Sequence, residues 1–325
     1  MPVAVTGSIA TDHLMTFPGK FAEQFVEGQM ENVSLSFLVD DLVQHRGGAG
    51  ANMAYGLGLL GLRPVLVGAV GSDFTDYEAW LNRHGVDTGS VRWSQLRHTA
   101  RFVCTTDAAN NQIASFYSGA MSEASEIELE PVLRRVGALD LVVVGPNDPT
   151  AMVRHTDECR ARGYRFAADP SQQLAWADGQ MIRSLVHGAD VLFTNEYESA
   201  LLCQKTGWTV EQVLDRVGTW VTTRASEGVL VRRAGHEPLS VIAVPETKPV
   251  EPTGGGDALR AGFIAGRIWG LGLERSTQLG SAVATEAVEV VGTQEYQLGR
   301  EPFLARFADA FGQEAADEVA VHLPA

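Results

Sequence analysis

A run of three glycines and an aspartate, at positions 254–257, is the part of the sequence with the clearest chemical potential. Apolar residues after Asp257 recur at helical spacing, at Leu259, Phe263 and Ile264, so the glycine turn is expected to open a helix. A helix N-terminus carries partial positive charge and unpaired backbone N–H groups, which together bind anions. A carboxylate there would repel an anion, but it could also remove the proton from a hydroxyl group that attacks phosphorus. Asp257 is therefore a candidate general base, and the alternative is an ordinary first-turn or capping aspartate.

A second glycine-rich turn, Arg-Gly-Gly-Ala-Gly-Ala-Asn at 46–52, also leads into a helical pattern. Its small residues allow a ligand to approach the backbone closely. Asn52 would lie in the first helical turn, where its amide can both donate and accept, which suits a diol or a hydroxyl group. Asp12 follows the Gly-Ser turn after the first predicted strand and can accept hydrogen bonds from two neighbouring hydroxyl groups. The structural alternatives are a helix cap for Asn52 and a surface turn for Asp12.

Asn195 and Glu198 follow a buried apolar segment, and a helix starting there would place them on one face. Their oxygens suit Mg²⁺, which prefers oxygen ligands and keeps part of its water shell. The same spacing also fits a helix capping box, and the sequence favours neither explanation. The polar loop at 221–228 follows another strand-like segment and would suit the lining of a nucleotide site.

Phe102 and Phe116 lie on two strand-like segments, each between polar residues. Such an aromatic pair can stack on a planar base, a contact that contributes about 1–3 kcal/mol per base. The alternative is that both rings belong to the apolar face of a small sheet. The eight histidines are scattered without metal-ligand spacing, so a histidine metal site is not expected.

The composition narrows the possible partners. With 40 acidic and 25 basic residues, the chain of 325 residues has a net charge of −15, which argues against binding nucleic acid or anionic membranes. No lysine occupies a Walker-type phosphate loop, so nucleotide phosphates would have to be bound by backbone amides, arginine and a metal. The three cysteines are far apart in sequence, and neither an export signal nor an apolar run of membrane-spanning length is recognisable. We therefore expect a cytoplasmic protein without membrane association.

Short apolar segments alternate with helical patterns, which is typical of a parallel sheet covered on both faces. The predicted buried strands are 139–145, 165–169 and 191–195, and the predicted helices between them are 150–163 and 180–188. Ligands of such sheets bind beyond the carboxyl ends of the strands, where Asp148, Asp169 and Asn195 are expected.

Three further segments break this pattern, at 33–39, 99–106 and 112–117. The first alternates polar and apolar residues, and a turn-rich connection joins the other two. We therefore predict a small antiparallel sheet that projects from the main body. The apolar face of such a sheet needs a ligand or another subunit to cover it. One domain with a lid is the simplest organisation that follows.

Taken together, the two glycine turns resemble the signatures of the ribokinase-like family, also called the phosphofructokinase-B-type carbohydrate kinases. The matching stretches are Gly-Gly-Ala-Gly-Ala-Asn at 47–52 and Pro-Thr-Gly-Gly-Gly-Asp-Ala at 252–258, followed by Arg-Ala-Gly-Phe at 260–263. Asn195 and Glu198 lie between them, in the expected place. The resemblance then extends over essentially the whole chain.

Membership of this family implies an α/β fold of three αβα layers, with a mostly parallel central sheet and a small β-sheet lid. It implies a single kinase domain over 1–325, with the lid formed by about 13–39 and 97–117. It also implies ATP and Mg²⁺ as cofactors and a homodimer formed through the lid, and it leaves a requirement for K⁺ open.

Other stretches resemble the bacterial adenosine kinases of mycobacterial type within that family, among them 5–15, 34–42, 168–174 and 292–295. This likeness implies ATP-dependent phosphorylation of the 5′-hydroxyl of adenosine, giving AMP and ADP, as in purine salvage. The alternatives are a kinase of another nucleoside, a free sugar or a sugar phosphate, and a nucleoside-binding regulator without catalysis. A dinucleotide-dependent dehydrogenase is disfavoured because no Gly-x-Gly-x-x-Gly follows the first predicted strand.

The resemblance also implies a role for each matching residue. The base for the substrate hydroxyl is Asp257, and the anion hole consists of Gly254, Gly255 and Gly256. The residues implied for the sugar hydroxyls are Asp12, Gly48 and Asn52, and those implied for the purine are Phe102, Phe116, Ser8, Ser36, Gln172 and Gln173. The residues implied for Mg-ATP are Asn195, Thr223, Ser226 and Gly228, with Glu198 on the metal side.

The sequence departs from the family pattern at four positions. The family usually has Gly where this chain has Ala225, and Asp where it has Glu251. It usually has a larger residue, such as Ala or Val, in place of Gly255, and Phe in place of Leu259. The additional glycine at 255 is expected to loosen the anion hole, by about 0.5–1 kcal/mol on the scale of glycine's conformational entropy. We therefore expect reduced turnover with retained activity, because Asp257 and the flanking glycines are present.

Overall fold

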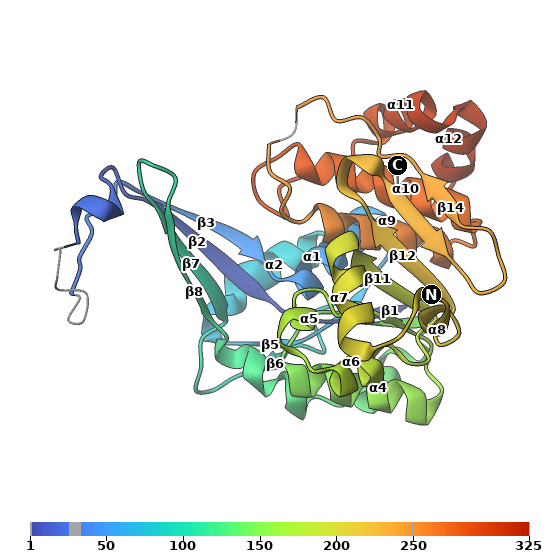
Figure 1. The fold of residues 1–325 in the computed structure, drawn as a ribbon, viewed down its shortest axis with the longest axis horizontal. Coiled ribbons are helices and arrows are strands. Elements are labelled where there is room, and N and C mark those ends of the chain that lie inside the picture. Colours follow the sequence, from blue (N-terminus) through green and yellow to red (C-terminus); the bar gives the residue numbers. More distant parts are fainter. Residues whose placement is uncertain (1, 26–33, 249, 325) are drawn as a thin grey trace.

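The computed structural model describes residues 2–25, 34–248 and 250–324, which are arranged in layers around a central sheet (Figure 1). The sheet has eight strands in the order β14-β13-β12-β11-β10-β9-β1-β4. The six from β12 to β4 are parallel, whereas β13 and β14 are antiparallel to their neighbours. The strands are β1 Val3–Thr6, β4 Val65–Val67, β9 Leu141–Val144, β10 Phe166–Ala168, β11 Val191–Asn195, β12 Thr219–Thr223, β13 Val229–Arg232 and β14 Leu239–Val241.

Side chains of the strands point alternately into two cores, one on each face of the sheet. Val5, Val143 and Phe193 belong to the first core, which is shared with helices α1, α2 and α9 to α12. Val142 and Leu192 belong to the second core, which is shared with α3 to α8. Because both faces are buried, the strands are nearly continuous apolar segments, which is the pattern that predicted them.

The helices cover the two faces of the sheet. Their bounds are α1 Ala49–Leu59, α2 Thr75–Arg83, α3 Leu129–Val136, α4 Pro149–Arg162, α5 Gln173–Trp176, α6 Gly179–Val186, α7 Glu196–Thr206, α8 Val210–Leu214, α9 Gly255–Ile268, α10 Leu273–Val288, α11 Arg300–Phe311 and α12 Gln313–Ala320. Within the described ranges, no helix is both long enough and apolar enough to span a membrane.

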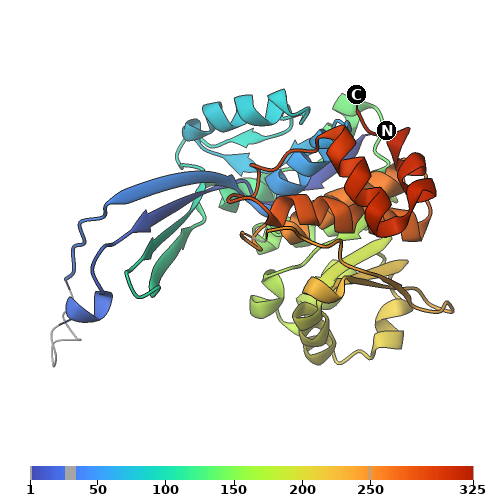
Figure 2. The same ribbon diagram turned by 90° about the horizontal axis from the view of Figure 1, so that it is seen from above.

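A second sheet of four strands projects from this body as a lid (Figures 1 and 2). Its strands, in spatial order, are β3 Asp41–Gly47, β2 Ala10–Thr16, β7 Ala100–Thr106 and β8 Gln112–Tyr117. The outer pairs are antiparallel, but β2 and β7 are parallel. The expectation of a wholly antiparallel sheet is therefore wrong for the central pair. The reason is that the chain crosses the body between β3 and β7, and such a crossover allows parallel pairing.

The segment predicted as a strand at 33–39 forms no strand in its described part, 34–39, and residue 33 lies outside the described residues. The strand comes later, at Asp41–Gly47. Phe37 instead packs against Phe17 and Phe21, with ring centroids 5.0 Å apart in each pair. The alternation of apolar and polar residues therefore reflects a small aromatic cluster, not a pleated strand.

The predicted fold class is confirmed. The three predicted buried strands coincide with β9, β10 and β11, and the two predicted helices coincide with α4 and α6. A further short parallel pair, β5 Ala69–Val70 with β6 Arg92–Trp93, lies outside the two main sheets.

Candidate active site

The two glycine turns predicted from the sequence lie next to each other, because the helices that they open pack closely. A Cβ placed on Gly56 of α1 would lie 2.7 Å from the Cβ of Ala261 in α9. This close approach holds the N-termini of both helices at the same edge of the molecule, beside the lid. Asn52 and Asp257, which are far apart in sequence, thereby come into contact.

The turn before α9 presents free backbone N–H groups. Gly254 has a φ of +85°, and a Cβ there would lie 2.9 Å from the Cβ of Thr293, so this position requires glycine. The N–H of Ala258 donates to Gly254, and that of Gly255 donates to Pro252. The N–H groups of Gly256 and Asp257 are in the first turn and have no intrahelical acceptor. These two N–H groups are available to an anion, whereas the N–H of Gly255, one of the three glycines predicted for the anion hole, already donates to Pro252.

Asp257 is held by a chain of hydrogen bonds through Asn52. The Asn52 Nδ2 donates to Asp257 Oδ2 at 2.9 Å. The Asn52 Oδ1 accepts from Thr293 Oγ1 at 2.9 Å and from Gln294 Nε2 at 3.0 Å. The Thr293 hydroxyl has a single proton and also lies 3.0 Å from the carbonyl oxygen of Arg46, so the amide of Gln294 is the donor that fixes which end of the Asn52 amide faces Asp257. Sequence reasoning gave no role to Thr293 and Gln294, since nothing local connects them to position 52.

The environment of Asp257 prepares it to accept a proton. Burial raises the pKa of its carboxyl group to about 6, against the opposing effects of the Arg260 charge and the hydrogen bond from Asn52. A carboxylate with a pKa near the working pH is an effective general base. The structure therefore supports the chemistry that the motif suggests, and the amide of Asn52 serves first to orient this carboxylate.

Behind Asp257, Arg260 and Asp169 form a buried ion pair that sequence reasoning did not identify. Arg260 Nε lies 2.7 Å from Asp169 Oδ2, and its Nη2 donates to Oδ1 at 2.8 Å. Asp169 follows β10 directly, where a ligand-binding residue was considered, and it faces this arginine instead. The motif includes Arg260, but its partner lies 91 positions away, and the sequence did not connect the two residues.

The lid contributes a row of four side chains across its strands. His45, Asp12, Phe102 and Phe116 are consecutive partners in the register of β3, β2, β7 and β8, so they share one face of the lid. His45 Nδ1 lies 2.7 Å from the point that a Cβ on Gly292 would occupy. The row therefore starts beside the loop that carries Thr293 and Gln294. Burial raises the pKa of Asp12 to about 6, and the nearby His45 opposes this shift.

The remaining substrate candidates lie around the carboxyl ends of β1 and β9, except for one. Ser8 Oγ accepts from the N–H of Ala49 at 3.0 Å, and Gln173 Nε2 donates to the carbonyl of Asn147 at 3.0 Å. A Cβ on Gly48, whose φ is +93°, would lie 2.6 Å from the carbonyl oxygen of Ser8. Gln172 is exposed next to Gln173, and Ser36 is exposed on the segment before β3. Ser36 makes no hydrogen bond to the other candidates in the described part of the chain.

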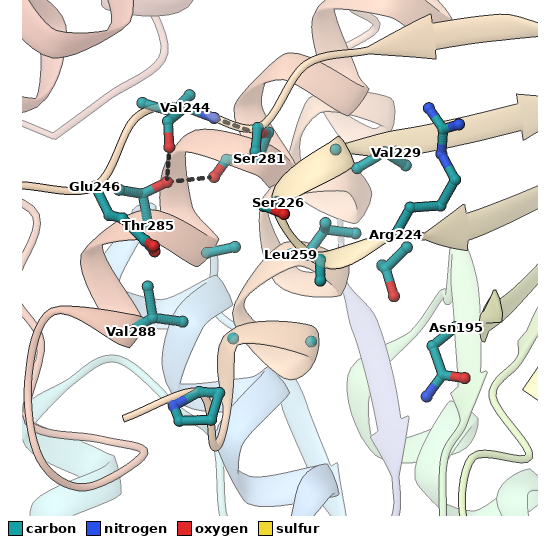
Figure 3. Close-up of a pocket in the computed structure, with 18 of the residues that line it drawn as sticks. Asn195, Arg224, Ser226, Val229, Val244, Glu246, Leu259, Ser281, Thr285 and Val288 are labelled. Atoms are coloured by element: carbon teal, nitrogen blue, oxygen red, sulfur yellow. Dashed lines mark hydrogen bonds between the residues drawn. The ribbon is translucent and has the colours of Figure 1, made fainter. Parts of the chain in front are cut away.

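A cavity of about 960 Å³ opens beside the start of α9 (Figure 3). The residues predicted for the nucleotide line it, namely Asn195, Thr223, Ser226 and Gly228, together with Gly255 and Gly256 of the anion hole. Its apolar walls come from Val229, Val244, Leu259 and Val288. Val244 and α10 were not predicted as part of this site, because apolar residues on a helix and a loop carry no distinctive pattern.

Asn195 and Glu198 form a capping box at the start of α7. The Glu198 N–H donates to Asn195 Oδ1, and the Asn195 N–H donates to Glu198 Oε2, each at 2.8 Å. The structural explanation left open by the sequence is therefore present. Burial raises the pKa of Glu198. No cluster of three metal-ligating side chains occurs among the described residues, so a metal here would depend on phosphate and water oxygens.

Two departures from the family pattern have a structural setting. The space where a Cβ of Gly255 would lie is 2.7 Å from Cγ1 of Val288, so this valine packs against the glycine. Ala225 has a φ of +46°, in the left-handed region that glycine adopts without strain. The side chain of Val288 thus occupies the space next to Gly255, whereas Ala225 leaves a strained backbone beside the cavity.

Comparison with known proteins agrees with this geometry. The family model described as "pfkB family carbohydrate kinase" matches residues 9–298 of this chain. A nucleoside kinase of Methanothermobacter thermautotrophicus is 31% identical over 272 residues, which cover 82% of this chain and 86% of that protein. The structure of Burkholderia thailandensis nucleoside kinase in complex with inosine is similar with a TM-score of 0.82 and 32% identity, covering 96% of this chain and 98% of that chain. With these matches and its site geometry, the chain belongs to the pfkB family of carbohydrate kinases, ribokinase-like enzymes that transfer phosphate to a hydroxyl acceptor.

Proposed function

We propose that this protein transfers the γ-phosphoryl group of ATP to the 5′-hydroxyl of a nucleoside, with adenosine as substrate and AMP and ADP as products. The observation that supports the proposal is a link between Asp257 and the lid through one loop. Asn52, which donates to Asp257, is hydrogen-bonded to Thr293 and Gln294. His45, the first member of the lid row that continues through Asp12, Phe102 and Phe116, lies beside Gly292 of the same loop. The Asp257 carboxylate and the adjacent free N–H groups suit attack of a hydroxyl on phosphorus. The lid row offers a carboxylate to sugar hydroxyls and two aromatic rings to a base.

In this mechanism Asp257 accepts the hydroxyl proton as the substrate oxygen attacks phosphorus, in line with the departing ADP oxygen. Asn52 occupies Oδ2 of Asp257, and Oδ1 has no hydrogen-bond partner among the described residues, so Oδ1 is available to the substrate. The N–H groups of Gly256 and Asp257 stabilise the charge on the transferred group. Closure of the lid excludes water, which limits hydrolysis of ATP.

ATP occupies the cavity beside α9, with its base against the apolar walls and its phosphates toward Gly256. Mg²⁺, when bound, neutralises charge on the phosphates. Glu198 fits this ion because Oε2 serves the capping box while Oε1 makes no hydrogen bond within the described residues, so Oε1 is available to a metal-bound water.

A panel of acceptors tests the proposal. ADP release with Mg-ATP is measured for adenosine, inosine, ribose and fructose 6-phosphate, with and without K⁺. The highest kcat/KM is expected with adenosine. Inosine is the second candidate, because the Burkholderia thailandensis relative was solved in complex with it. A preference for ribose or fructose 6-phosphate would favour a sugar kinase, and absence of ADP with every acceptor would favour a regulator without catalysis.

The same proposal includes a homodimer formed through the lid, in the cytoplasm, without nucleic acid or membrane partners. Its support is the set of exposed apolar side chains on or beside the lid strands, namely Leu38, Leu42, Ile113, Phe116 and Tyr117. Sedimentation equilibrium is expected to give twice the monomer mass, and Ile113→Asp is expected to reduce it to the monomer mass. A wild-type monomer would contradict the dimer.

A further inference from the structure

Arg260 is a buried cation that the mechanism above does not use. Its residue exposure is 6%. Its Nη2 donates to Asp169 Oδ1, and its Nε lies 2.7 Å from Asp169 Oδ2 as part of the ion pair. Nη2 also donates to Ser171 Oγ at 3.2 Å, and Ser171 Oγ in turn donates to Asp169 Oδ1 at 2.7 Å. The third nitrogen, Nη1, has no hydrogen-bond partner in the part of the chain that the structure describes. The guanidinium is thus fixed in orientation with one donor group unused.

Helix geometry directs this unused group toward the anion hole. Arg260 follows Gly256 by one helical turn, so the two residues lie on the same face of α9. Side chains on a helix lean toward its N-terminus. Nη1 accordingly lies 2.7 Å from the point that a Cβ on Gly256 would occupy. The glycine at 256 leaves the space that the guanidinium needs to reach the start of the helix.

The charges around Arg260 are consistent with a role in binding an anion. The carboxylates of Asp169, Asp257 and Glu198 all stabilise the charged guanidinium against the effect of burial and raise its pKa. Among the described residues, Asp169 is the only one that forms an ion pair with it. Nη1 therefore combines a permanent positive charge, a fixed direction and a free donor, which are the features of an effective phosphate ligand.

On the basis of the proposed function, we infer that Arg260 is a catalytic residue whose Nη1 donates a hydrogen bond to the transferred phosphoryl group. In the transfer, a bond forms between the substrate oxygen and phosphorus, the bond from phosphorus to the bridging oxygen of ADP breaks, and the hydroxyl proton passes to Asp257. Charge on the equatorial oxygens is stabilised by Nη1 together with the N–H groups of Gly256 and Asp257. Asp169 is a positioning residue, which holds the guanidinium in place.

The test compares Arg260→Gln with wild type in steady-state kinetics and in ligand binding. We expect kcat to fall about 100-fold, the effect of removing one charge-stabilising donor, with KM for the acceptor changed less than about threefold. Affinity for ADP with aluminium fluoride, which imitates the transferred group, should fall by a similar factor, whereas affinity for ADP alone should not. Guanidinium ion added to Arg260→Gly should restore part of the lost kcat.

Controls separate this role from a structural one. Arg232→Gln removes another half-buried arginine, which stacks 4.1 Å over the ring of Trp220, and should leave kcat unchanged. If circular dichroism shows Arg260→Gln to be unfolded, the double variant Asp169→Asn/Arg260→Gln is measured in its place. It removes both charges of the ion pair, so neither partner remains as an unpaired buried charge. A folded variant with kcat within threefold of wild type, or with unchanged affinity for ADP and aluminium fluoride, would overturn the inference.

The outcome is independent of the nucleoside assignment. The kinetics use whichever hydroxyl acceptor the wild type phosphorylates, and the binding measurement needs no acceptor. Phosphorylation of a sugar in place of a nucleoside would contradict the proposed function and leave the Arg260 experiment intact. Normal phosphorylation of adenosine by Arg260→Gln would contradict the inference and leave the proposed function intact.

Discussion

Asp257 belongs to helix α9 of the body and Asp12 to strand β2 of the lid, and the two carboxyl groups are held in different ways. Burial raises the pKa of each carboxyl group to about 6. Asp257 is in addition fixed by Asn52, whose own amide oxygen accepts a hydrogen bond from Gln294. Asp12 lies on a strand of the projecting sheet, in the same row as Phe116, which is 54% exposed. In the proposed function, this contrast places the reacting groups on the closely packed body and substrate recognition on the more exposed projecting sheet.

The largest effect is expected from a substitution of Asp257, the carboxylate on the body. Asp257→Asn should lower kcat at least about 100-fold, because the substrate hydroxyl loses its general base. The unfolding transition should remain cooperative, since asparagine can still accept the hydrogen bond from Asn52. ADP release and thermal unfolding measure the two effects.

The pH profile and a matched carboxylate variant complete that experiment. A base must be ionised to accept a proton, so wild-type kcat/KM should fall as the pH decreases through about 6, the raised pKa of Asp257. Asp148→Asn removes another strand-end carboxylate, which caps α4, and should leave kcat unchanged. Near-normal turnover by Asp257→Asn would remove Asp257 from the role of base.

The second prediction addresses the lid. Phe102→Ala should weaken binding of adenosine by about 1–3 kcal/mol, the value of one stacked base, and should change kcat little. The readout is KM for adenosine together with the affinity measured by calorimetry. Tyr117→Ala is the control, because Tyr117 is an aromatic residue of β8 that follows Phe116 and therefore points to the opposite face of the lid. Equal effects of the two variants would favour the sugar kinase alternative or a purely structural role.

The third prediction tests how tightly the anion hole is packed. Gly255→Ala introduces a Cβ 2.7 Å from Cγ1 of Val288, so it should destabilise the fold by about 1–3 kcal/mol. The variant Gly255→Ala/Val288→Ala should recover most of that loss, as measured by urea unfolding. If Gly255→Ala alone raises both stability and kcat, the expectation of a loose anion hole is correct and the packing of Val288 is unimportant.

The smallest expected effect concerns the strained loop of the nucleotide cavity. Ala225→Gly should raise the free energy of unfolding by less than about 1 kcal/mol, because glycine adopts the φ of +46° without strain but is more flexible when unfolded. Ala243→Gly, in the same cavity wall, has no such strain to relieve and should be destabilising. Urea unfolding of both variants measures the difference, and equal destabilisation would show that the strain at Ala225 is negligible.

The predictable part of the fold consists of features that adjacent residues determine. Buried parallel strands are continuous apolar segments, and glycine turns before helices are local motifs, so β9 to β11 and the starts of α1 and α9 follow from the sequence. The prediction of a strand at 33–39 was wrong because the residues of an aromatic cluster produce the same alternation of polar and apolar residues as a strand. Alternation alone does not show whether a partner strand exists.

The unpredicted part of the site consists of contacts between distant segments. The ion pair of Arg260 with Asp169 and the bonds from Thr293 and Gln294 to Asn52 join residues 91 to 242 positions apart. Single polar residues of these types are common everywhere in the chain, so composition and spacing do not mark them. Their functions emerge only when the packing of α1 against α9 is known.

The bonds that orient Asn52 also have a consequence for biosynthesis. Segments containing Asn52, Asp257 and the pair Thr293–Gln294 must all have left the ribosome before the proton acceptor is aligned. All eight strands of the central sheet precede the segments with Asp257 and Thr293–Gln294, because β14, the last of the strands in the chain, ends at Val241. A nascent chain that halts shortly before position 293 therefore has most of its scaffold but an unsupported amide, and the capacity to consume ATP arises only as translation nears its end.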